Sequence, residues 1–312
     1  MTSSEPRLTS RQPDGEPKAE PSDSSSAVAS SAPAAGHAAN AKRHARTEPS
    51  SGRRSRSTGD RRWLTALPVY NEVDYVDAVL DKVLQYSDRV LVVNDGSTDG
   101  TAARLQECRA ERPDRVAVVN HPSNRGYGAA LQSVFAYTLE HGFDGVVTLD
   151  CDGQHQPHRI PRFIEAAAAA DIVSGSRYLK EYEGDDAPPQ ERMFINRRLT
   201  ADLNRRLGLS LSDAFCGFKA YRAEGLARMQ ITDPGYAMPL QLWVEAVAAG
   251  LRVIELPVPR IYLDLERSFG GSLDHAETRL NYYNRVLNDA IARARAEGRW
   301  QAPTTRDRMT GA

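Results

Sequence analysis

Two aspartates one residue apart, Asp150 and Asp152, follow the apolar run at residues 146–149. Residues i and i+2 of an extended strand share a face, so both carboxylates can point into one cleft. Two such charges need a compensating cation or a shared proton, and a hard divalent cation prefers carboxylate and phosphate oxygens. Gln154 offers a third oxygen. The spacing predicts a metal site at Asp150, Asp152 and Gln154; the competing interpretation is a polar turn that caps the next helix.

Polar residues also end two earlier apolar runs. Residues 68–72 (PVYNE) follow the first run, and residues 94–101 (NDGSTDGT) follow the second. Gly96 permits a sharp turn, and the Thr and Asp after it can cap the following helix. A capped turn does not require Asp95, which is placed to accept hydrogen bonds from a base or ribose.

Gly126 and Gly128 match part of the dinucleotide-binding fingerprint G-x-G-x-x-G, but Leu131 stands where its last small residue belongs. No such loop follows the first apolar run either, so the sequence disfavours a hydride-transfer enzyme.

Apolar runs alternate with segments of helical periodicity. We predict strands at residues 63–69, 89–95, 116–121, 145–150, 171–176, 215–221 and 251–259, the last at an edge because of its prolines. We predict helices at residues 75–84, 98–108, 126–142, 158–170, 191–208, 238–250 and 275–298. This alternation indicates an α/β fold: a Rossmann-like, doubly wound, mostly parallel sheet with helices on both faces. Ligands of such sheets lie beyond the C-terminal strand ends.

Composition limits the classes of function. The chain has 312 residues, a formal net charge of −1 and three cysteines. Neither attraction to nucleic acid nor a disulfide or zinc framework is indicated. No apolar stretch reaches the roughly 20 residues of a membrane span, and we find no secretory signal. We therefore expect a soluble protein of the cytoplasm.

Residues 1–58 have almost no large apolar side chains, so we expect a disordered leader. Residues 42–62 hold eight Lys or Arg against two acidic residues, a local charge of +6. The leader is either simply solvated or docks on anionic lipid at the inner face of the membrane, at about 1 kcal/mol per basic residue. The expected domains are the leader (1–58), an α/β domain (59–272), a helix packed on or flanking it (273–298) and a disordered tail (299–312).

Six segments occur in an order typical of one enzyme family: residues 68–72 (PVYNE), 94–99 (NDGSTD), 124–130 (NRGYGAA), 150–155 (DCDGQH), 175–178 (GSRY) and 213–219 (DAFCGFK). Over about residues 63–270, this set resembles the family 2 glycosyltransferases of the GT-A fold. The branch that it most resembles is the polyprenyl- (dolichol-) phosphate mannosyl- and glucosyltransferases, in particular a soluble bacterial subgroup.

The resemblance implies an inverting transfer of mannose or glucose from a nucleotide-diphosphate sugar, GDP-mannose or UDP-glucose, to a polyprenyl phosphate. The implied donor-binding residues are Pro68, Tyr70, Asn71, Glu72, Asp95, Gly96, Asn124 and Gly126. The implied ligands of Mg²⁺ or Mn²⁺ are Asp150, Asp152 and Gln154. The implied catalytic residues are these two aspartates, Asp213 near the transferred sugar, and three arginines facing the acceptor phosphate: Arg177, Arg197 (or Arg198) and Arg267.

Other interpretations stay open. A phosphate acceptor needs positioning by arginines, whereas a soluble hydroxyl acceptor would need a base such as Asp213 or Glu245. Leu273 and Tyr127 stand where the branch often has lysine, which bears on the acceptor. A sugar-phosphate nucleotidyltransferase is disfavoured because PVYNE is not a glycine-rich basic loop. A non-catalytic nucleotide- or partner-binding relative is disfavoured by the intact Asp150 set.

Overall fold

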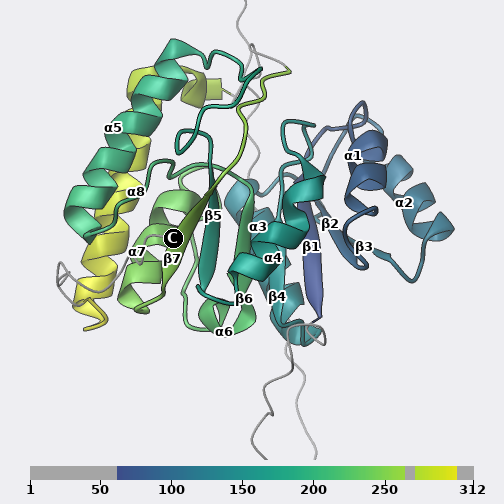
Figure 1. The fold of residues 1–312 in the computed structure, drawn as a ribbon, viewed down its shortest axis with the longest axis horizontal. Coiled ribbons are helices and arrows are strands. Elements are labelled where there is room, and N and C mark those ends of the chain that lie inside the picture. The colour runs from purple at the N-terminus through teal and green to yellow at the C-terminus, as the bar shows by residue number, and fades with distance from the viewer. Residues whose placement is uncertain (1–61, 264–270, 301–312) are drawn as a thin grey trace, which may run out of the picture. The chain divides into compact units, whose positions relative to one another are not determined.

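The computed structural model describes residues 62–263 and 271–300 (Figure 1). Its strands are β1 Trp63–Val69, β2 Val90–Asn94, β3 Val116–Asn120, β4 Gly145–Thr148, β5 Ile172–Ser176, β6 Lys219–Arg222 and β7 Val253–Pro257. Its helices are α1 Val76–Val83, α2 Thr101–Glu111, α3 Tyr127–Glu140, α4 Ile160–Ala166, α5 Gln190–Leu207, α6 Ala223–Leu226, α7 Met238–Ala248 and α8 Ala276–Ala296, with short 3₁₀ turns η2 Pro157–Arg159 and η3 Gly271–Asp274. The predicted leader and Arg267 lie outside the described residues, as does the predicted tail from residue 301 onward. No helix within the described ranges combines the length and apolarity that crossing a bilayer requires.

Within these ranges the strands form one sheet in the order β3-β2-β1-β4-β6-β5-β7. Strands β3, β2, β1 and β4 are parallel, β5 and β7 are parallel to each other, and β6 lies antiparallel between β4 and β5. The predicted α/β class with a mostly parallel sheet is confirmed. Strand β7 lies at the sheet edge, where its prolines predicted it.

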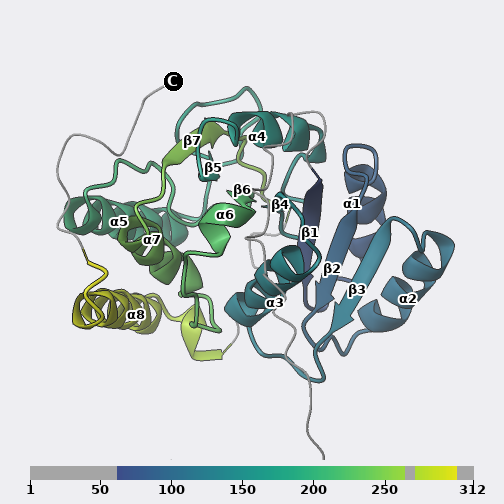
Figure 2. The same cartoon turned by 90° about the horizontal axis from the view of Figure 1, so that it is seen from below.

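The sheet is covered on both faces because its strands carry apolar residues on both sides. In β1, Leu64 and Ala66 join a cluster with residues of α3, α5, α7 and α8, while Leu67 and Val69 join a second cluster with residues of α1, α2 and α4. Figure 2 shows α1 and α4 on one side of the sheet and α3, α7 and α8 on the other. Polar groups therefore gather at the strand ends.

The antiparallel direction of β6 brings a further segment to those ends. Residues that precede an antiparallel strand reach the same edge as residues that follow a parallel one. The segment 213–218 precedes β6 and so meets the residues that follow β4 and β5. The Gly175 amide donates to the Phe218 carbonyl (2.7 Å), and the Thr148 hydroxyl donates to the Gly217 carbonyl (2.9 Å).

Helices α5, α7 and α8 pack against one another beside the sheet (Figure 1). Glu245 of α7 is fully buried and accepts from two arginines, Arg293 of α8 (2.9 Å) and Arg299 just beyond it (2.8 Å). The Gln230 amide donates a further bond to it (3.0 Å). Glu245 is thus a structural anchor for α8, and the structure does not bring it to the cavity described below.

We predict that Glu245→Gln lowers the free energy of unfolding by about 3 kcal/mol at neutral pH, because it removes the carboxylate partner of Arg293 and one of the two carboxylate partners of Arg299. Burial raises the pKa of Glu245, but the bonds from Arg299 and Arg293 outweigh it, and the pKa lies below its usual 4.5. A carboxyl group whose pKa is lower in the folded state than in the unfolded state stabilises the fold above pH 4.5. This stabilisation is lost as the pH falls through the folded-state pKa. Urea unfolding of both proteins should therefore give a difference that shrinks on acidification; a constant difference would contradict the assignment.

Candidate active site at the C-terminal strand ends

A cavity of about 590 Å³ lies at the C-terminal ends of the strands. One half is lined by residues that follow β1, β2 and β4, and it holds the acidic side chains Glu72, Asp95, Asp150 and Asp152. The other half is lined by residues from the end of β5, from α5 and from α8, and it holds the basic side chains Arg177, Arg192 and Arg279. The acidic and the basic lining residues thus come from different elements, and we call these two groups the acidic half and the basic half of the cavity.

Hydrogen bonds hold the loops after β1 and β2 together. The Asn71 side chain accepts from the Thr98 amide (2.8 Å), and the Ser97 hydroxyl accepts from the Asn71 amide (2.9 Å). Asp99 accepts from the Thr101 amide (3.0 Å) at the start of α2, but the N-cap residue of this helix is Gly100 and not the predicted Thr or Asp. Pro68, Tyr70 and Glu72 line the cavity, whereas Asn71 and Gly96 hold the loops and are not among its lining residues.

Asp95 is buried at the end of β2 and organises the next loop. Its Oδ1 contacts the His121 ring nitrogen Nδ1 (2.6 Å) and accepts from the Arg125 amide (3.0 Å), and its Oδ2 accepts from the Gly126 amide (2.8 Å). Asn124 and Gly126 thereby line the cavity together with Asp95. This predicted donor-binding group is assembled in one place.

The two glycines of that loop make room for a neighbouring backbone. A Cβ on Gly126 or Gly128 would overlap backbone atoms of residues 233–234. The Ala129 amide donates to the Pro234 carbonyl (3.0 Å) across this close approach. The glycine spacing thus reflects packing against residues 233–234.

Asp150 and Asp152 lie in the turn after β4, which ends at Thr148, and both line the cavity with Gln154. Asp150 makes long contacts with the Tyr127 hydroxyl and the His155 ring (3.3 Å each), and its side chain is 32% exposed. Burial raises the pKa of Asp150, but His155, the charge of Lys219 and the Tyr127 hydroxyl outweigh it, and the pKa lies below 3.8. Asp150 is therefore a carboxylate at neutral pH.

The donor set suits a hard cation only in part. Among the described residues, no group of three or more His, Cys, Asp or Glu side chains is arranged to hold a metal. Asp150 and Asp152 supply carboxylate oxygens and Gln154 an amide oxygen, the ligand types that Mg²⁺ and Mn²⁺ accept alongside substrate phosphates. These residues fit a metal that shares its coordination with a bound diphosphate.

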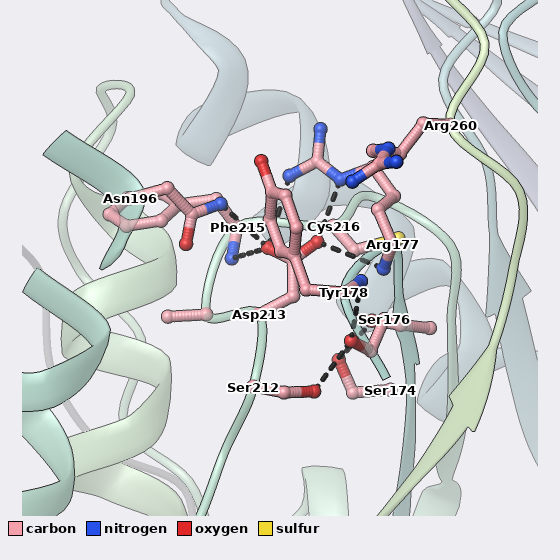
Figure 3. Close-up of polar contacts among 12 residues, drawn as sticks. Ser174, Ser176, Arg177, Tyr178, Asn196, Ser212, Asp213, Phe215, Cys216 and Arg260 are labelled. Atoms are coloured by element: carbon pink, nitrogen blue, oxygen red, sulfur yellow. Dashed lines mark hydrogen bonds and ion pairs between the residues drawn. The ribbon is translucent and has the colours of Figure 1, made fainter. Parts of the chain in front are cut away.

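Asp213 is fully buried and contacts Arg177, a basic lining residue of the cavity (Figure 3). It accepts from Arg177 Nε (2.7 Å) and Nη2 (3.0 Å), from the Asn196 amide group (2.8 Å) and from the Phe215 backbone (3.1 Å). Burial raises its pKa, but the Arg177 charge and these bonds outweigh it and lower the pKa to about 2. Arg177 lines the cavity and Asp213 does not, so Asp213 positions Arg177.

A further layer holds Asp213 in place. Glu255 of β7 accepts from the backbone amides of Ser212 (2.8 Å) and Asp213 (3.0 Å). The Ser212 and Ser176 hydroxyls are 2.6 Å apart, and Ser176 accepts from the Tyr178 amide (3.2 Å) (Figure 3). The end of β5, which carries Arg177 and Tyr178, is thus fixed from below by β7.

Helix α5 presents a different arginine from the predicted one. Arg197 and Arg198 are exposed and do not line the cavity, whereas Arg192 does. Arg192 lies three and four residues before Ile195 and Asn196, which are buried and also line the cavity. The helical period of the sequence could have identified Arg192, because it places this residue on the same inward face of α5 as Ile195 and Asn196.

Helix α8 contributes two residues that the sequence interpretation missed, Arg279 and Tyr283. The Arg279 guanidinium donates to the Leu273 carbonyl (2.6 Å) and pairs with Glu191 at the start of α5. Arg279 and Tyr283 fall on the buried stripe of α8 at i and i+4. The signal in the sequence that could have identified Arg279 is its position, as a charged residue, within an otherwise apolar stripe of the helix.

A doubly wound sheet that ends in carboxylates over a cavity is the arrangement expected of a GT-A glycosyltransferase. The glucosyl-3-phosphoglycerate synthase of Mycobacterium tuberculosis shares this fold, with a TM-score of 0.53 at 20% identity over 76% of this chain and 81% of that one. The profile of glycosyl transferase family 2 matches residues 65–229, and the chain belongs to that family.

Two curated relatives are similar over most of their length. An undecaprenyl-phosphate mannosyltransferase of Micrococcus luteus is 34% identical over 219 residues, or 68% of this chain and 86% of that protein. A polyprenol monophosphomannose synthase of Mycolicibacterium smegmatis is 31% identical over 203 residues, or 63% and 76%. The predicted resemblance to polyprenyl-phosphate mannosyltransferases is confirmed.

We predict that Gly217→Ala lowers the transfer rate by about 100-fold, because a small displacement of a reacting group has an effect of that size. A Cβ on Gly217 would overlap the Asp150 carboxylate, and Gly217 has no positive φ that would add backbone strain. Gly225→Ala is the matched control, since its Cβ would come no closer than 3.3 Å to a neighbour. Equal kcat values for the two variants, both folded by circular dichroism, would refute the role of this contact.

We predict that Asp213→Asn weakens acceptor use by roughly 100-fold in kcat/KM, because misplacing Arg177 has an effect of that order, and leaves the dissociation constant of the donor unchanged. The control is Asp202→Asn, which removes the ion pairs of Asp202 with Arg205 and Arg206, outside the cavity lining. Steady-state kinetics with varied acceptor measure kcat/KM, and separate donor titrations measure the dissociation constant of the donor. A loss of donor affinity would instead link Asp213 to donor binding and contradict this prediction.

Proposed function

We propose that this chain is an inverting hexosyltransferase that moves mannose or glucose from a nucleotide-diphosphate sugar to a polyprenyl phosphate. The observation that carries the proposal is that one cavity is lined by an acidic and a basic group of residues, which come from different elements. A diphosphate donor with its cation suits the first half, and an anionic acceptor suits the second.

Donor binding is assigned to the loops after β1, β2 and β4. The fastened turns at residues 70–73 and 95–101 form a rigid wall for a nucleoside, and the Asp95-bound loop at residues 124–126 continues it. Mg²⁺ or Mn²⁺ held by Asp150, Asp152 and Gln154 would neutralise the charge that develops on the departing diphosphate.

The acceptor half favours a phosphate over a soluble hydroxyl. A hydroxyl would need a general base, but Asp213 is saturated by Arg177 and Asn196, and Glu245 is held by two arginines outside the cavity. A phosphate monoester is already anionic, and planar guanidinium groups orient it well. Arg177 and Arg192 are the residues assigned to it.

The chemical step forms one bond and breaks another. An oxygen of the acceptor phosphate attacks the anomeric carbon from the face opposite the diphosphate, the carbon–oxygen bond to the diphosphate breaks, and the configuration inverts. The products are a hexosyl phosphodiester of the lipid and a nucleoside diphosphate. The residues of the chain hold both anions in line, which accounts for much of the barrier reduction in such reactions.

The names of the relatives agree with this assignment. The M. luteus protein is an undecaprenyl-phosphate mannosyltransferase and the M. smegmatis protein a polyprenol monophosphomannose synthase. Mannose is therefore the first sugar to test. A protein with a lipid acceptor would act in the cytoplasm at the inner face of the membrane.

The test incubates the 312-residue chain with GDP-mannose or UDP-glucose and a short-chain prenyl phosphate, with and without Mn²⁺. We expect a metal-dependent hexosyl phosphate product with one donor, and its loss in Asp152→Ala. A protein that binds the nucleotide sugar but turns over neither donor would instead support the non-catalytic alternative.

We predict that Arg192→Gln raises the KM for the short-chain prenyl phosphate by about tenfold, because a charge-assisted bond contributes roughly 1.5 kcal/mol or more. Arg197→Gln on the same helix should leave that KM unchanged, since its exposed side chain does not line the cavity. Initial rates with varied acceptor distinguish the two variants. The opposite ranking would restore Arg197 as the acceptor residue.

A further inference from the structure

Asp95, the acidic residue after β2, is held by a buried histidine that the proposed transfer does not use. The Asp95 Oδ1 atom lies 2.6 Å from Nδ1 of His121, and both side chains are only 4% exposed. A carboxylate oxygen only accepts hydrogen bonds, so His121 Nδ1 is the donor. The other ring nitrogen, Nε2, lies 2.8 Å from the hydroxyl of Ser133 on α3. Asp95, His121 and Ser133 therefore form one hydrogen-bonded row.

The same three residue types form the catalytic triad of serine hydrolases, in which the serine attacks the substrate. In this row the serine is at the wrong end for that chemistry. Asp95 lines the cavity, whereas Ser133 is not among the lining residues. The row is therefore suited to orienting the carboxylate of Asp95, and it does not present Ser133 to a substrate in this cavity.

His121 connects Asp95 to elements that are fixed by the fold. It directly follows β3, and its amide donates to the Asn94 carbonyl at the end of β2 (2.9 Å). The Asn94 side chain also donates to Asn120, the last residue of β3 (2.9 Å). Ser133 fixes the far side of the ring to α3, whose apolar residues share a buried cluster with β1 and β2. The imidazole is thus held between the sheet and a helix packed on it.

Asp95 in turn holds the loop at residues 124–126. Its Oδ1 also accepts from the Arg125 amide (3.0 Å), and its Oδ2 accepts from the Gly126 amide (2.8 Å). A carboxylate offers about four acceptor positions, so the contacts with His121, Arg125 and Gly126 leave about one of them for a ligand. The direction of that position, and the place of the loop that lines the cavity beside it, both depend on the plane of the carboxylate.

We propose that His121 and Ser133 are positioning residues for the donor: they set the plane of the Asp95 carboxylate and, through it, the loop at residues 124–126. This inference rests on the proposed function, which assigns Asp95 and this loop to a nucleotide sugar. Neither His121 nor Ser133 lines the cavity, so both act through Asp95. Loss of the row therefore weakens donor binding and leaves the KM of the acceptor unchanged.

Two substitutions of His121 separate its two ring contacts. The side-chain amide nitrogen of asparagine can take the place of Nδ1, and that of glutamine the place of Nε2. His121→Asn thus keeps a donor for Asp95 and loses the contact with Ser133, whereas His121→Gln does the reverse. We expect His121→Gln to raise the dissociation constant of the donor by about tenfold, since it removes a charge-assisted hydrogen bond. His121→Asn and Ser133→Ala each remove a neutral hydrogen bond, and we expect about threefold.

Binding and loop order are measured separately. Calorimetric titration of the 312-residue chain with GDP-mannose and with UDP-glucose, in Mn²⁺, gives the dissociation constant of the donor. Initial rates with varied short-chain prenyl phosphate give the KM of the acceptor. Hydrogen exchange of the peptide at residues 122–130 reports on the two loop amides that Asp95 holds. This exchange should become faster in His121→Gln and stay nearly unchanged in His121→Asn.

The matched control is His141→Gln. His141 directly follows α3, contacts the Tyr137 carbonyl (3.0 Å) and does not line the cavity. It tests whether the loss of any histidine next to this helix disturbs the donor half. We expect donor affinity, acceptor KM and exchange of the loop peptide to equal those of the unaltered chain.

Equal donor affinity in the unaltered chain and in folded His121→Gln overturns the proposal. Equal losses in His121→Gln and His121→Asn, or a rise in acceptor KM as large as the rise in donor dissociation constant, also overturn it, because the ring would then act through general packing. If His121→Gln does not fold, Ser133→Ala decides, and unchanged donor affinity in that variant refutes the row. If the unaltered chain binds neither sugar nucleotide, the proposed function fails, and hydrogen exchange alone decides whether His121 sets the loop.

Discussion

The ion pair between Asp213 and Arg177 is the contact on which the basic half of the cavity depends. Arg177 follows a buried strand, and a guanidinium group there needs a partner that fixes its plane. Asp213 supplies two acceptor oxygens from below, and it reaches that position only because β6 runs antiparallel between β4 and β5. Glu255 of β7 then holds the backbone of Asp213. One reversed strand thus links the topology of the sheet to the orientation of a cavity arginine.

The acidic residues of the chain differ in role because their surroundings differ. Asp213 and Glu245 are buried, and their oxygen atoms accept hydrogen bonds from arginines. Both residues therefore have a structural role. Asp150 has long contacts of 3.3 Å and is one-third exposed to the cavity, so it keeps oxygen sites for a ligand. Asp95 is an intermediate case, because it lines the cavity and also fixes a loop. Partner geometry, more than residue type, separates a ligand-binding carboxylate from an anchor.

The sequence predicted the strands, the helices and the cluster of polar strand ends because burial on both faces leaves a strong periodic signal. It could not predict that β6 is antiparallel, since a short apolar run has no direction. The family resemblance placed Asp213 near the transferred sugar, and the structure shows that it pairs with Arg177 and does not line the cavity. Arg197 was chosen from a basic helix by motif order alone, while the helical period of its neighbours favoured Arg192. Asn71 and Gly96 belong to donor-loop motifs, yet their interactions are with the adjoining loops.

The two halves of the cavity also differ in where their residues lie along the chain. The acidic half is built within residues 65–229, the part that matches the family profile. The basic half draws Arg279 and Tyr283 from α8, beyond that part, and Glu245 anchors α8 through Arg293 and Arg299. Arg177 and Arg192 lie within the matched part, so the basic half combines residues of that part with residues of a helix that buried ion pairs attach to α7.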